Sequence, residues 1–295
     1  MVPPEGRTAI LAWYAATGRE LAFRRSTDPY HVLVSELMAQ QTQAERAALA
    51  WEAWVERWPT VADLAGAPVA DVLRAWAGLG YNRRALALHR AAQAIVADHG
   101  GVVPGDVGAL EALPGVGPYT ARAVAALAFG RPVGAVDVNV RRVLGRMASG
   151  GAEAYAPKAM QELADAVVPP DAAAAWTHAL MDLGARLCKP AKPRCADCPA
   201  TAWCRYAAGE RPAAAASQAP VTRRVAPRFE TTRRWLRGRI LDRARDVAPG
   251  EWAAYPDAIG AHQHVAVREA MLDLAAEGLL EAREGEDGPE ARLPG

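Results

Sequence analysis

The sequence predicts a mostly helical fold. Apolar residues recur at helical spacing over long segments, alternating strand patterns are scarce, and prolines fall at the connections between the segments. Helices are expected at 5–17, 31–58, 69–79, 83–99, 119–129, 139–148, 157–167 and 171–187. The connecting prolines are those at 59, 68, 104, 114, 118, 132, 169 and 170, and no internal repeat is detected.

The composition is that of an ordinary globular protein. Its 295 residues are 51% hydrophobic, enough for a sizeable core in one large domain plus a smaller one. No apolar run reaches the roughly 18 residues of a membrane span, and the first residues lack the order of a secretion signal. A cytoplasmic protein is therefore expected. The formal net charge is +1, so any nucleic-acid binding must come from a local basic patch.

The segment 31–58 carries a glutamate in an apolar setting. Glu36 is flanked by apolar residues at 32–34 and at 37–38. Such a setting raises a carboxyl pKa and keeps the group usable as an acid near neutral pH. The common alternative is a glutamate on a solvated helix face.

The stretch LPGVGPYTARA at 113–123 places two glycines between two prolines, at the junction of two helices. Gly115, Val116 and Gly117 can turn tightly and point their N–H groups outward, next to the positive end of the helix that begins near Pro118. This arrangement suits the binding of a phosphate group. A purely structural helical hairpin is the alternative. A dinucleotide fingerprint is disfavoured because no strand precedes the glycines.

A second carboxyl lies in VDVNVRRV at 136–143. Asp137 stands in a loop that enters a helix, with Asn139 two residues later and Arg141 after it. The helix start favours the charged form of this carboxyl, although many aspartates there are only helix caps. Two carboxyls in different environments can divide glycosidic cleavage, one protonating a leaving base and one stabilising the sugar cation.

All four cysteines lie in 17 residues, at Cys188, Cys195, Cys198 and Cys204. Four thiolates so close suit a 4Fe-4S cluster; zinc and unligated core cysteines are the alternatives. Residues 186–206 carry five positive charges and one negative, a net of +4. A ligated loop would present this charge rigidly to phosphate groups, whereas a solvated face is the alternative. The basic residues inside the loop are Lys189, Lys192 and Arg194.

The C-terminal part differs in composition. Residues 207–228 are predicted to be a linker, and 229–295 show two helical segments and a possible returning strand, an order that resembles a winged helix. Residues 211–245 carry ten positive and two negative charges, a net of +8, and residues 246–295 carry three and eleven, a net of −8. The basic part suits DNA, while a solvated capping module is equally compatible.

Together these motifs resemble the helix-hairpin-helix DNA glycosylases of the endonuclease III superfamily, over about residues 5–206, and most closely the MutY-type adenine glycosylases. The matching segments are LAFR at 21–24, DPYHVLVSELMAQQTQ at 28–43, GLGY at 78–81, LPGVGPYTA at 113–121, VDVNVRRV at 136–143, ALMDLGARLC at 179–188 and the cysteine loop.

The resemblance implies an all-α, two-lobed fold. An iron-sulfur lobe would comprise residues 1–21 and 133–206, and a six-helix barrel with the helix-hairpin-helix would comprise 22–132. A small winged-helix-like domain at 229–295 would stand where the longer MutY-type enzymes carry a Nudix-like domain.

The same resemblance implies the site. Glu36 would protonate adenine and help to deliver water, and Asp137 would stabilise the sugar, with Tyr119 and Asn139 beside them. Superfamily members that also cut the strand have a lysine where this chain has Tyr119, so a monofunctional glycosylase is expected. The implied DNA-binding residues are Gln41 and Tyr81, which intercalate, and Gly115, Val116, Gly117, Arg141, Lys189, Lys192 and Arg194. The implied base pocket contains Leu21, Arg24 and His178, and the cluster ligands are the four cysteines.

The predicted function is removal of adenine mispaired with 8-oxoguanine or guanine, by a monomer acting on double-stranded DNA. Asn82, Thr177 and His178 depart from the MutY pattern toward that of endonuclease III. Tyr119 also suits thymine or uracil mismatch glycosylases of the same superfamily, which are the alternative. A non-catalytic iron-sulfur DNA-binding regulator is a further alternative, and Glu36 and Asp137 argue against it.

Overall fold

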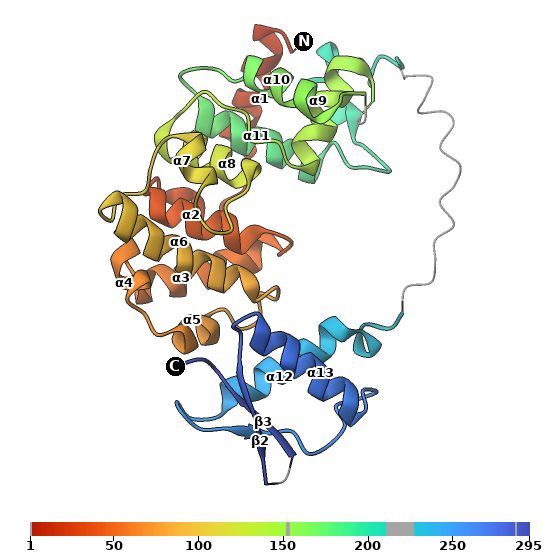
Figure 1. Cartoon of the computed structure of the whole chain (residues 1–295). Helices are drawn as coiled ribbons and strands as arrows, with labels where there is room; N and C mark the ends of the chain where they lie inside the picture. The colour runs from red at the N-terminus through yellow and green to blue at the C-terminus, as the bar shows by residue number, and fades with distance from the viewer. Residues whose placement is uncertain (1, 152–153, 211–226, 287) are drawn as a thin grey trace. The chain divides into compact units, whose positions relative to one another are not determined.

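The structure is a computed structural model that describes residues 2–151, 154–210, 227–286 and 288–295 (Figure 1). The predicted linker lies largely outside the described residues. The helices before it are α1 Pro4–Thr17, α2 Pro29–Ala39, α3 Ala44–Arg57, α4 Val61–Ala65, α5 Val69–Ala75, α6 Arg83–His99, α7 Val107–Glu111, α8 Pro118–Phe129, α9 Val138–Ser149, α10 Pro157–Ala166 and α11 Ala173–Arg186. The elements after it are α12 Arg233–Asp246, β1 Ala253–Ala254, α13 His264–Ala276, β2 Glu281–Gly285 and β3 Gly288–Arg292.

The helical prediction is confirmed over most of its length, with one clear error. The expected helix 31–58 is two helices, α2 and α3, separated by a break around Gln41, whose φ is 53°. The short helices α4 and α7 were not predicted, because five residues are too few to show a periodicity. Each is instead begun by a side-chain cap, from Thr60 in α4 and from Asp106 in α7.

The chain divides into two compact units. The first unit comprises Met1–Glu36, Val103–Ala112 and Val116–Thr222. Its core is formed by α1, α9, α10 and α11, each of which buries an apolar face. Ile10, Leu144, Met160 and Trp176 are among the buried residues of this core.

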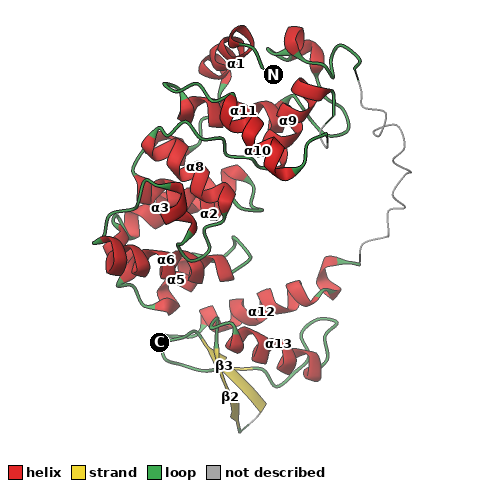
Figure 2. Cartoon of the chain, turned by 45° about the horizontal axis from the view of Figure 1, so that its top comes forward, coloured by secondary structure: helices red, strands yellow, loops and turns green. Residues whose placement is uncertain are grey.

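The second unit comprises Leu37–Val102, Leu113–Gly115 and Arg223–Gly295. In its helical part, the indole of Trp54 packs edge-on against those of Trp58 and Trp76, with ring centroids 4.7 and 5.5 Å away. In its C-terminal part, α12 and α13 lie side by side next to the strands (Figures 1 and 2). The three strands form an antiparallel sheet in the order β1-β3-β2.

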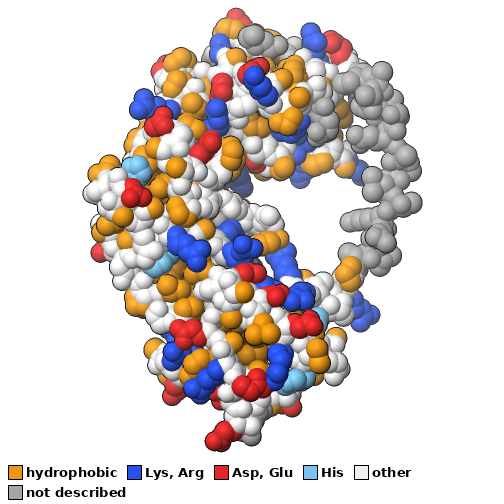
Figure 3. All heavy atoms as spheres, viewed as in Figure 1, with side chains coloured by type: hydrophobic (Ala, Val, Ile, Leu, Met, Phe, Trp, Pro, Cys, Tyr) orange, Lys and Arg blue, Asp and Glu red, His pale blue; other side chains and the backbone are white. Residues whose placement is uncertain are grey.

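The charge asymmetry of the C-terminal sequence is resolved by ion pairs in the fold. Acidic and basic side chains are interspersed over this part of the chain (Figure 3). Pairs that join the basic stretch to the acidic one are Arg237–Glu277 at 2.6 Å, Arg233–Glu269 at 3.7 Å and Arg233–Asp273. Among the described residues, part of the basic stretch is therefore neutralised by acidic residues of the 269–277 segment.

Within the described residues, none of the helices combines the length and the apolar character required for a membrane span.

Candidate active site

Glu36 is a buried carboxyl on α2, and the surroundings predicted from the sequence are confirmed. Its neighbours Val32, Leu33 and Leu37 are also buried, so this helix is enclosed by apolar side chains. Burial raises the pKa of Glu36 to about 7, and a nearby negative charge from Asp137 acts in the same direction. A carboxyl with this pKa can both donate and accept a proton at neutral pH.

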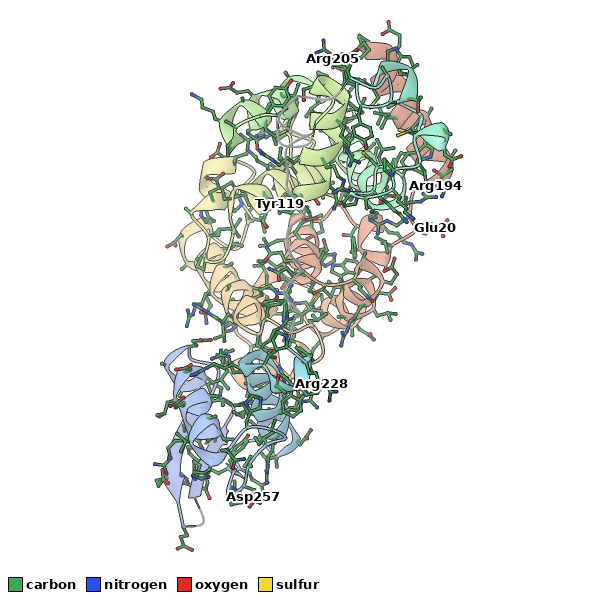
Figure 4. The ribbon with its side chains drawn as sticks, turned by 90° about the vertical axis from the view of Figure 1, so that its right-hand side faces the viewer. Glu20, Tyr119, Arg194, Arg205, Arg228 and Asp257 are labelled. Carbon is green, nitrogen blue, oxygen red and sulfur yellow. The ribbon has the colours of Figure 1, made fainter. Side chains whose placement is uncertain are left out.

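Tyr119, labelled in Figure 4, is the second residue of α8. Its side chain contacts that of Glu36. Its hydroxyl donates a hydrogen bond to the Glu36 carboxyl, and this bond lowers the pKa of Glu36 against the effect of burial. Burial and the neighbouring carboxyls raise the pKa of Tyr119 well above its usual range. The phenol therefore stays protonated and remains a donor.

Asp137 is the N-cap of α9. One of its carboxyl oxygens accepts a hydrogen bond from the Val140 N–H at 2.6 Å, and the other accepts from the Asn139 side-chain amide at 2.9 Å. The capping interpretation is thus correct, and it is compatible with a second role because Asp137 also lies within electrostatic range of Glu36. Within the first unit, the fold brings together Glu36, Tyr119, Asp137 and Asn139.

Arg142 extends this group of hydrogen bonds. Its guanidinium donates to the Asn139 side-chain oxygen at 2.8 Å, to the Gly184 carbonyl at 2.8 Å and to the Cys188 carbonyl at 2.6 Å. Gly184 also allows α11 to approach α9, because a Cβ there would lie 2.6 Å from that of Asn139. Asp137 is therefore connected through hydrogen bonds to the start of the cysteine loop.

The residues predicted for the base pocket surround a buried ion pair in the first unit. Arg24 donates two hydrogen bonds to the fully buried Asp182, at 2.8 and 3.0 Å, and Arg19 donates a third at 2.7 Å. Burial opposes ionisation of Asp182, but these hydrogen bonds outweigh it and lower its pKa to about 2. Asp182 is thus a fixed negative charge that holds Arg24 in place.

His178 lies next to this ion pair. Burial, together with the positive charge of Arg24, lowers the pKa of His178 to about 3, so the imidazole is neutral at physiological pH. Its ring stacks with that of Tyr14 at 6.2 Å between centroids. Its Nδ1 is buried and has no hydrogen-bond partner among the described residues. Leu21, also predicted for this pocket, is buried at the start of the turn that carries Arg24.

The four cysteines line one cavity in the first unit, together with apolar side chains of α9 and α11. Arg146 reaches into this cavity, with its guanidinium 3.4 Å from the Cys188 sulfur. Burial raises the pKa of the Cys198 thiol to about 11, against a hydrogen bond from the Ala200 backbone. Within the described ranges, no three His, Cys, Asp or Glu side chains are arranged to hold a metal ion. The four thiols line a shared cavity but do not converge closely enough to bind a single metal ion.

The basic residues of the loop differ in their availability. Lys189 and Lys192 are exposed, whereas Arg194 is held by Asp197 in an exposed ion pair at 2.8 Å (Figure 4). Arg141, on α9, donates to the Tyr155 carbonyl at 2.5 Å and is half-buried. The sequence could not distinguish these cases because the partners depend on the path of the loop.

The two predicted intercalating residues, Gln41 and Tyr81, lie in the second unit. In the described part of the chain they are the only residues other than glycine with a positive φ, 53° and 47°. Both segments are held by Arg84, whose guanidinium donates to the carbonyls of Leu37 at 2.7 Å and Leu79 at 3.1 Å. The same guanidinium also donates hydrogen bonds to the carbonyls of Met38, Gln40 and Gly80. Strained backbone of this kind concentrates at functional sites.

The hairpin glycines have distinct structural roles. Gly115 has φ 76°, and a Cβ there would lie 2.5 Å from that of Ala87 on α6, so only glycine fits. Gly117 is the exposed N-cap of α8, and the Val116 side chain is buried. Only backbone groups of this turn are therefore left to meet a ligand.

Three contributors to these sites were not predicted: Asp182, Arg142 and Arg84. Asp182 belongs to the motif ALMDLGARLC, which marks it as significant but not as the partner of Arg24, 158 residues away. Arg84 and Arg142 carry no local signal beyond their charge. Their functions depend on contacts between segments distant in sequence.

The chain matches a protein family described as "HhH-GPD superfamily base excision DNA repair protein" over residues 34–170. It is 41% identical to the adenine DNA glycosylase of Mycolicibacterium smegmatis over 290 residues, which cover 95% of this chain and 97% of the relative. It is 47% identical to the adenine DNA glycosylase of Mycobacterium tuberculosis over 240 residues, 80% of this chain and 77% of the relative.

Among solved structures, a thermostable thymine-DNA glycosylase matches with a TM-score of 0.65 and 32% identity, over 69% of this chain and 95% of that one. A trapped endonuclease III–DNA covalent intermediate matches with a TM-score of 0.59 and 23% identity, over 69% and 94% of the two chains, and shows the same helical fold. With 41% identity over nearly the whole of both chains, this protein belongs to the adenine DNA glycosylase family of the HhH-GPD superfamily.

Proposed function

We propose that this protein removes adenine from duplex DNA where it is mispaired with 8-oxoguanine or guanine, and leaves an abasic site. The observation that carries this proposal is a carboxyl, Glu36, with a pKa of about 7 that accepts a hydrogen bond from Tyr119 and lies near Asp137. The adenine DNA glycosylases of the two mycobacteria support adenine as the excised base.

In the proposed reaction, protonated Glu36 donates its proton to a ring nitrogen of adenine. The bond between the sugar C1′ and the base nitrogen then breaks, and its electron pair leaves with the base. The sugar cation is stabilised by the Asp137 carboxylate, and a water oxygen adds to C1′ while Glu36 takes up the water's proton. Glu36 is thereby returned to its protonated form.

The proposed enzyme has no lyase activity. A phenol at Tyr119 cannot form a Schiff base, and Lys158, Lys189 and Lys192 are the lysines of the chain. Lys158 is exposed on α10, and the other two are in the cysteine loop. Borohydride trapping on a mismatched duplex should yield no covalent adduct. An adduct as abundant as that of a lyase would reject this part of the proposal.

His178 is proposed to bind the extruded base, with Leu21 and Arg24. The supporting observation is its buried Nδ1 without a partner among the described residues, on a ring that is neutral at physiological pH. A neutral imidazole can donate from one nitrogen and accept at the other, as a base edge requires. It would stand where MutY-type enzymes commonly carry Gln or Glu.

The proposed DNA contacts are of two kinds. Gln41 and Tyr81 enter the duplex when the nucleotide is extruded, and backbone groups of Gly115, Val116 and Gly117 bind a phosphate. The phosphates of the DNA backbone are contacted by Lys189 and Lys192, and also by Arg141 and Arg194. The exposure of the two lysines supports this part best.

A 4Fe-4S cluster is proposed for the cavity between Cys188, Cys195, Cys198 and Cys204. The donor set fits, because four thiols face one space and backbone N–H groups of residues 200, 206 and 207 point at the sulfurs. A cluster would fix the conformation of the basic loop. Absorbance near 400 nm that is lost with the iron tests it, and stoichiometric zinc without iron would reject it.

The remaining parts of the proposal concern the whole protein. The order helix, strand, helix and β-hairpin supports a winged-helix-like C-terminal domain. We further propose a monomer that acts in the cytoplasm on the nucleoid. Sedimentation with and without duplex DNA tests the oligomeric state.

The decisive experiment compares duplexes with A:8-oxoguanine, A:G, T:G and U:G pairs, followed by alkaline cleavage of abasic sites. Cleavage of the adenine strand in the first two is expected. A thymine or uracil mismatch glycosylase is the second candidate, favoured by the 32% identity to a thymine-DNA glycosylase. Cleavage confined to T:G or U:G would select it, and binding without cleavage would indicate a regulator.

A further inference from the structure

Tyr81 has a contact that none of the sequence motifs predicts. Arg234, on α12 in the C-terminal part of the second unit, donates a hydrogen bond to the Tyr81 hydroxyl at 2.8 Å. Its guanidinium carbon also lies 4.1 Å from the centre of the Tyr81 ring. Arg84 lies 5.6 Å from the centre of the same ring. Tyr81 is thus in contact with two guanidinium groups, one of them from the C-terminal domain.

The position of α12 against this loop depends on a second arginine. Arg245 donates to the Leu73 carbonyl at 3.0 Å and to the Asn82 side-chain oxygen at 2.7 Å, and its side chain is only 9% exposed. Arg234 and Arg245 are eleven residues apart, close to three helical turns, so they lie on the same face of α12. Asn82, a departure from the MutY pattern, thus has a partner in the C-terminal domain.

Arg234 also differs from its neighbours in charge balance. Arg233 and Arg237 pair with acidic residues of the 269–277 segment, and Arg239 and Arg245 pair with Asp242. Arg234 has no carboxylate partner in the described part of the chain. Its positive charge is therefore not compensated next to an exposed tyrosine with strained backbone.

We propose that Arg234 is a positioning residue that holds the Tyr81 side chain in the orientation required for entry into the duplex. The C-terminal domain thereby takes part in base extrusion. This inference rests on the proposed intercalation of Tyr81. A ring held in advance loses less conformational freedom when it intercalates, so the extruded state is reached more often. Because Arg234 has no carboxylate partner, its charge also suits the nearby DNA backbone.

The test uses the full chain with Arg234→Ala, Arg234→Lys and the matched control Arg243→Ala. Arg243 lies nine residues further along α12, on its opposite face, also without a carboxylate partner among the described residues, and its guanidinium stacks on the Tyr255 ring at 5.2 Å. The readouts are the single-turnover excision rate at saturating enzyme, the dissociation constant, and the fluorescence of 2-aminopurine beside the mismatch, which reports extrusion separately from chemistry.

Arg234→Ala should lower the excision rate and the 2-aminopurine signal about tenfold, with a dissociation constant within about threefold of that of Arg243→Ala. Arg234→Lys should bind as tightly as Arg243→Ala but should not restore the excision rate, because an ammonium lacks the planar face. Arg234→Ala behaving as Arg243→Ala in every readout would overturn the inference.

Tyr81→Ala separates the inference from its premise. The Tyr81→Ala variant should have a low excision rate. Adding Arg234→Ala to this variant should not lower the rate further, because the two residues act together. Multiplying effects would overturn the inference alone and leave the intercalation of Tyr81 intact. A Tyr81→Ala variant with full rate and full 2-aminopurine signal would reject the intercalation and the inference with it.

Discussion

Glu36 and Asp182 are both buried carboxyls of the first unit, yet their surroundings shift their pKa values in opposite directions. That of Glu36 is raised to about 7 and that of Asp182 is lowered to about 2. Burial opposes ionisation in both. Asp182 receives charged hydrogen bonds from Arg24 and Arg19, whereas Glu36 receives a neutral one from Tyr119.

The comparison shows that the donors, rather than burial, decide which carboxyl can exchange a proton. Asp182 remains an anion and holds Arg24, which is proposed to line the base pocket. The pKa of Glu36 stays near neutral pH, so this carboxyl can act first as an acid and then as a base. The following predictions alter one side of this comparison at a time.

The largest effect is expected from Glu36→Gln. An amide cannot transfer the proton, so single-turnover excision should fall by about 10²- to 10⁴-fold. Glu52→Gln on the exposed face of α3 is the control and should keep the full rate. Equal rates for the two variants would remove Glu36 from the reaction.

The next effect concerns Asp182. Arg24→Ala leaves a fully buried carboxylate with Arg19 alone, so the free energy of unfolding should fall by about 3–5 kcal/mol. The control is Arg57→Ala, which breaks an ion pair with Asp71 whose partners are 46% and 36% exposed and should cost less than about 1 kcal/mol. Urea unfolding measures both, and similar losses would show that burial does not distinguish them.

A third prediction concerns the pH dependence of the protein's stability that arises from Glu36. Folded Glu36 keeps its proton up to pH about 7, while the unfolded chain releases it near 4.5, so the folded state binds more protons between these values. Stability should therefore fall as pH rises through this window. Glu36→Gln removes the effect and should be more stable than the parent at pH 8, by up to about 3 kcal/mol, and equal to it near pH 4. Parallel pH profiles of unfolding would contradict the raised pKa.

The smallest change is expected from Tyr119→Phe. The Tyr119 hydroxyl lowers the pKa of Glu36, so its removal should raise that pKa further. The alkaline limb of the excision rate should then move to higher pH by less than about one unit. A pH profile of the single-turnover rate measures it. A limb that stays in place or moves to lower pH would show that Tyr119 does not act through Glu36.

Most helices follow from local pattern, but the loop of Gln41 does not. The segment 31–58 contains no glycine or proline, so its periodicity predicts one continuous helix. In the fold, the carbonyls at the end of α2 bond to Arg84 instead of continuing the helix. The break is thus imposed by a residue more than forty positions away.

The sequence by itself determined the helical fold class, the family, the apolar setting of Glu36 and the grouping of the four cysteines. These features depend on residue type and on short spacings along the chain, which do not require knowledge of the tertiary contacts. The tertiary structure alone decided that Asp182 binds Arg24, that Arg142 joins Asn139 to the cysteine loop, and that Arg234 meets Tyr81. Each of these three contacts joins segments that are distant in the sequence. Periodicity determines which face of a helix is buried, but it does not determine which side chain of another segment that face contacts.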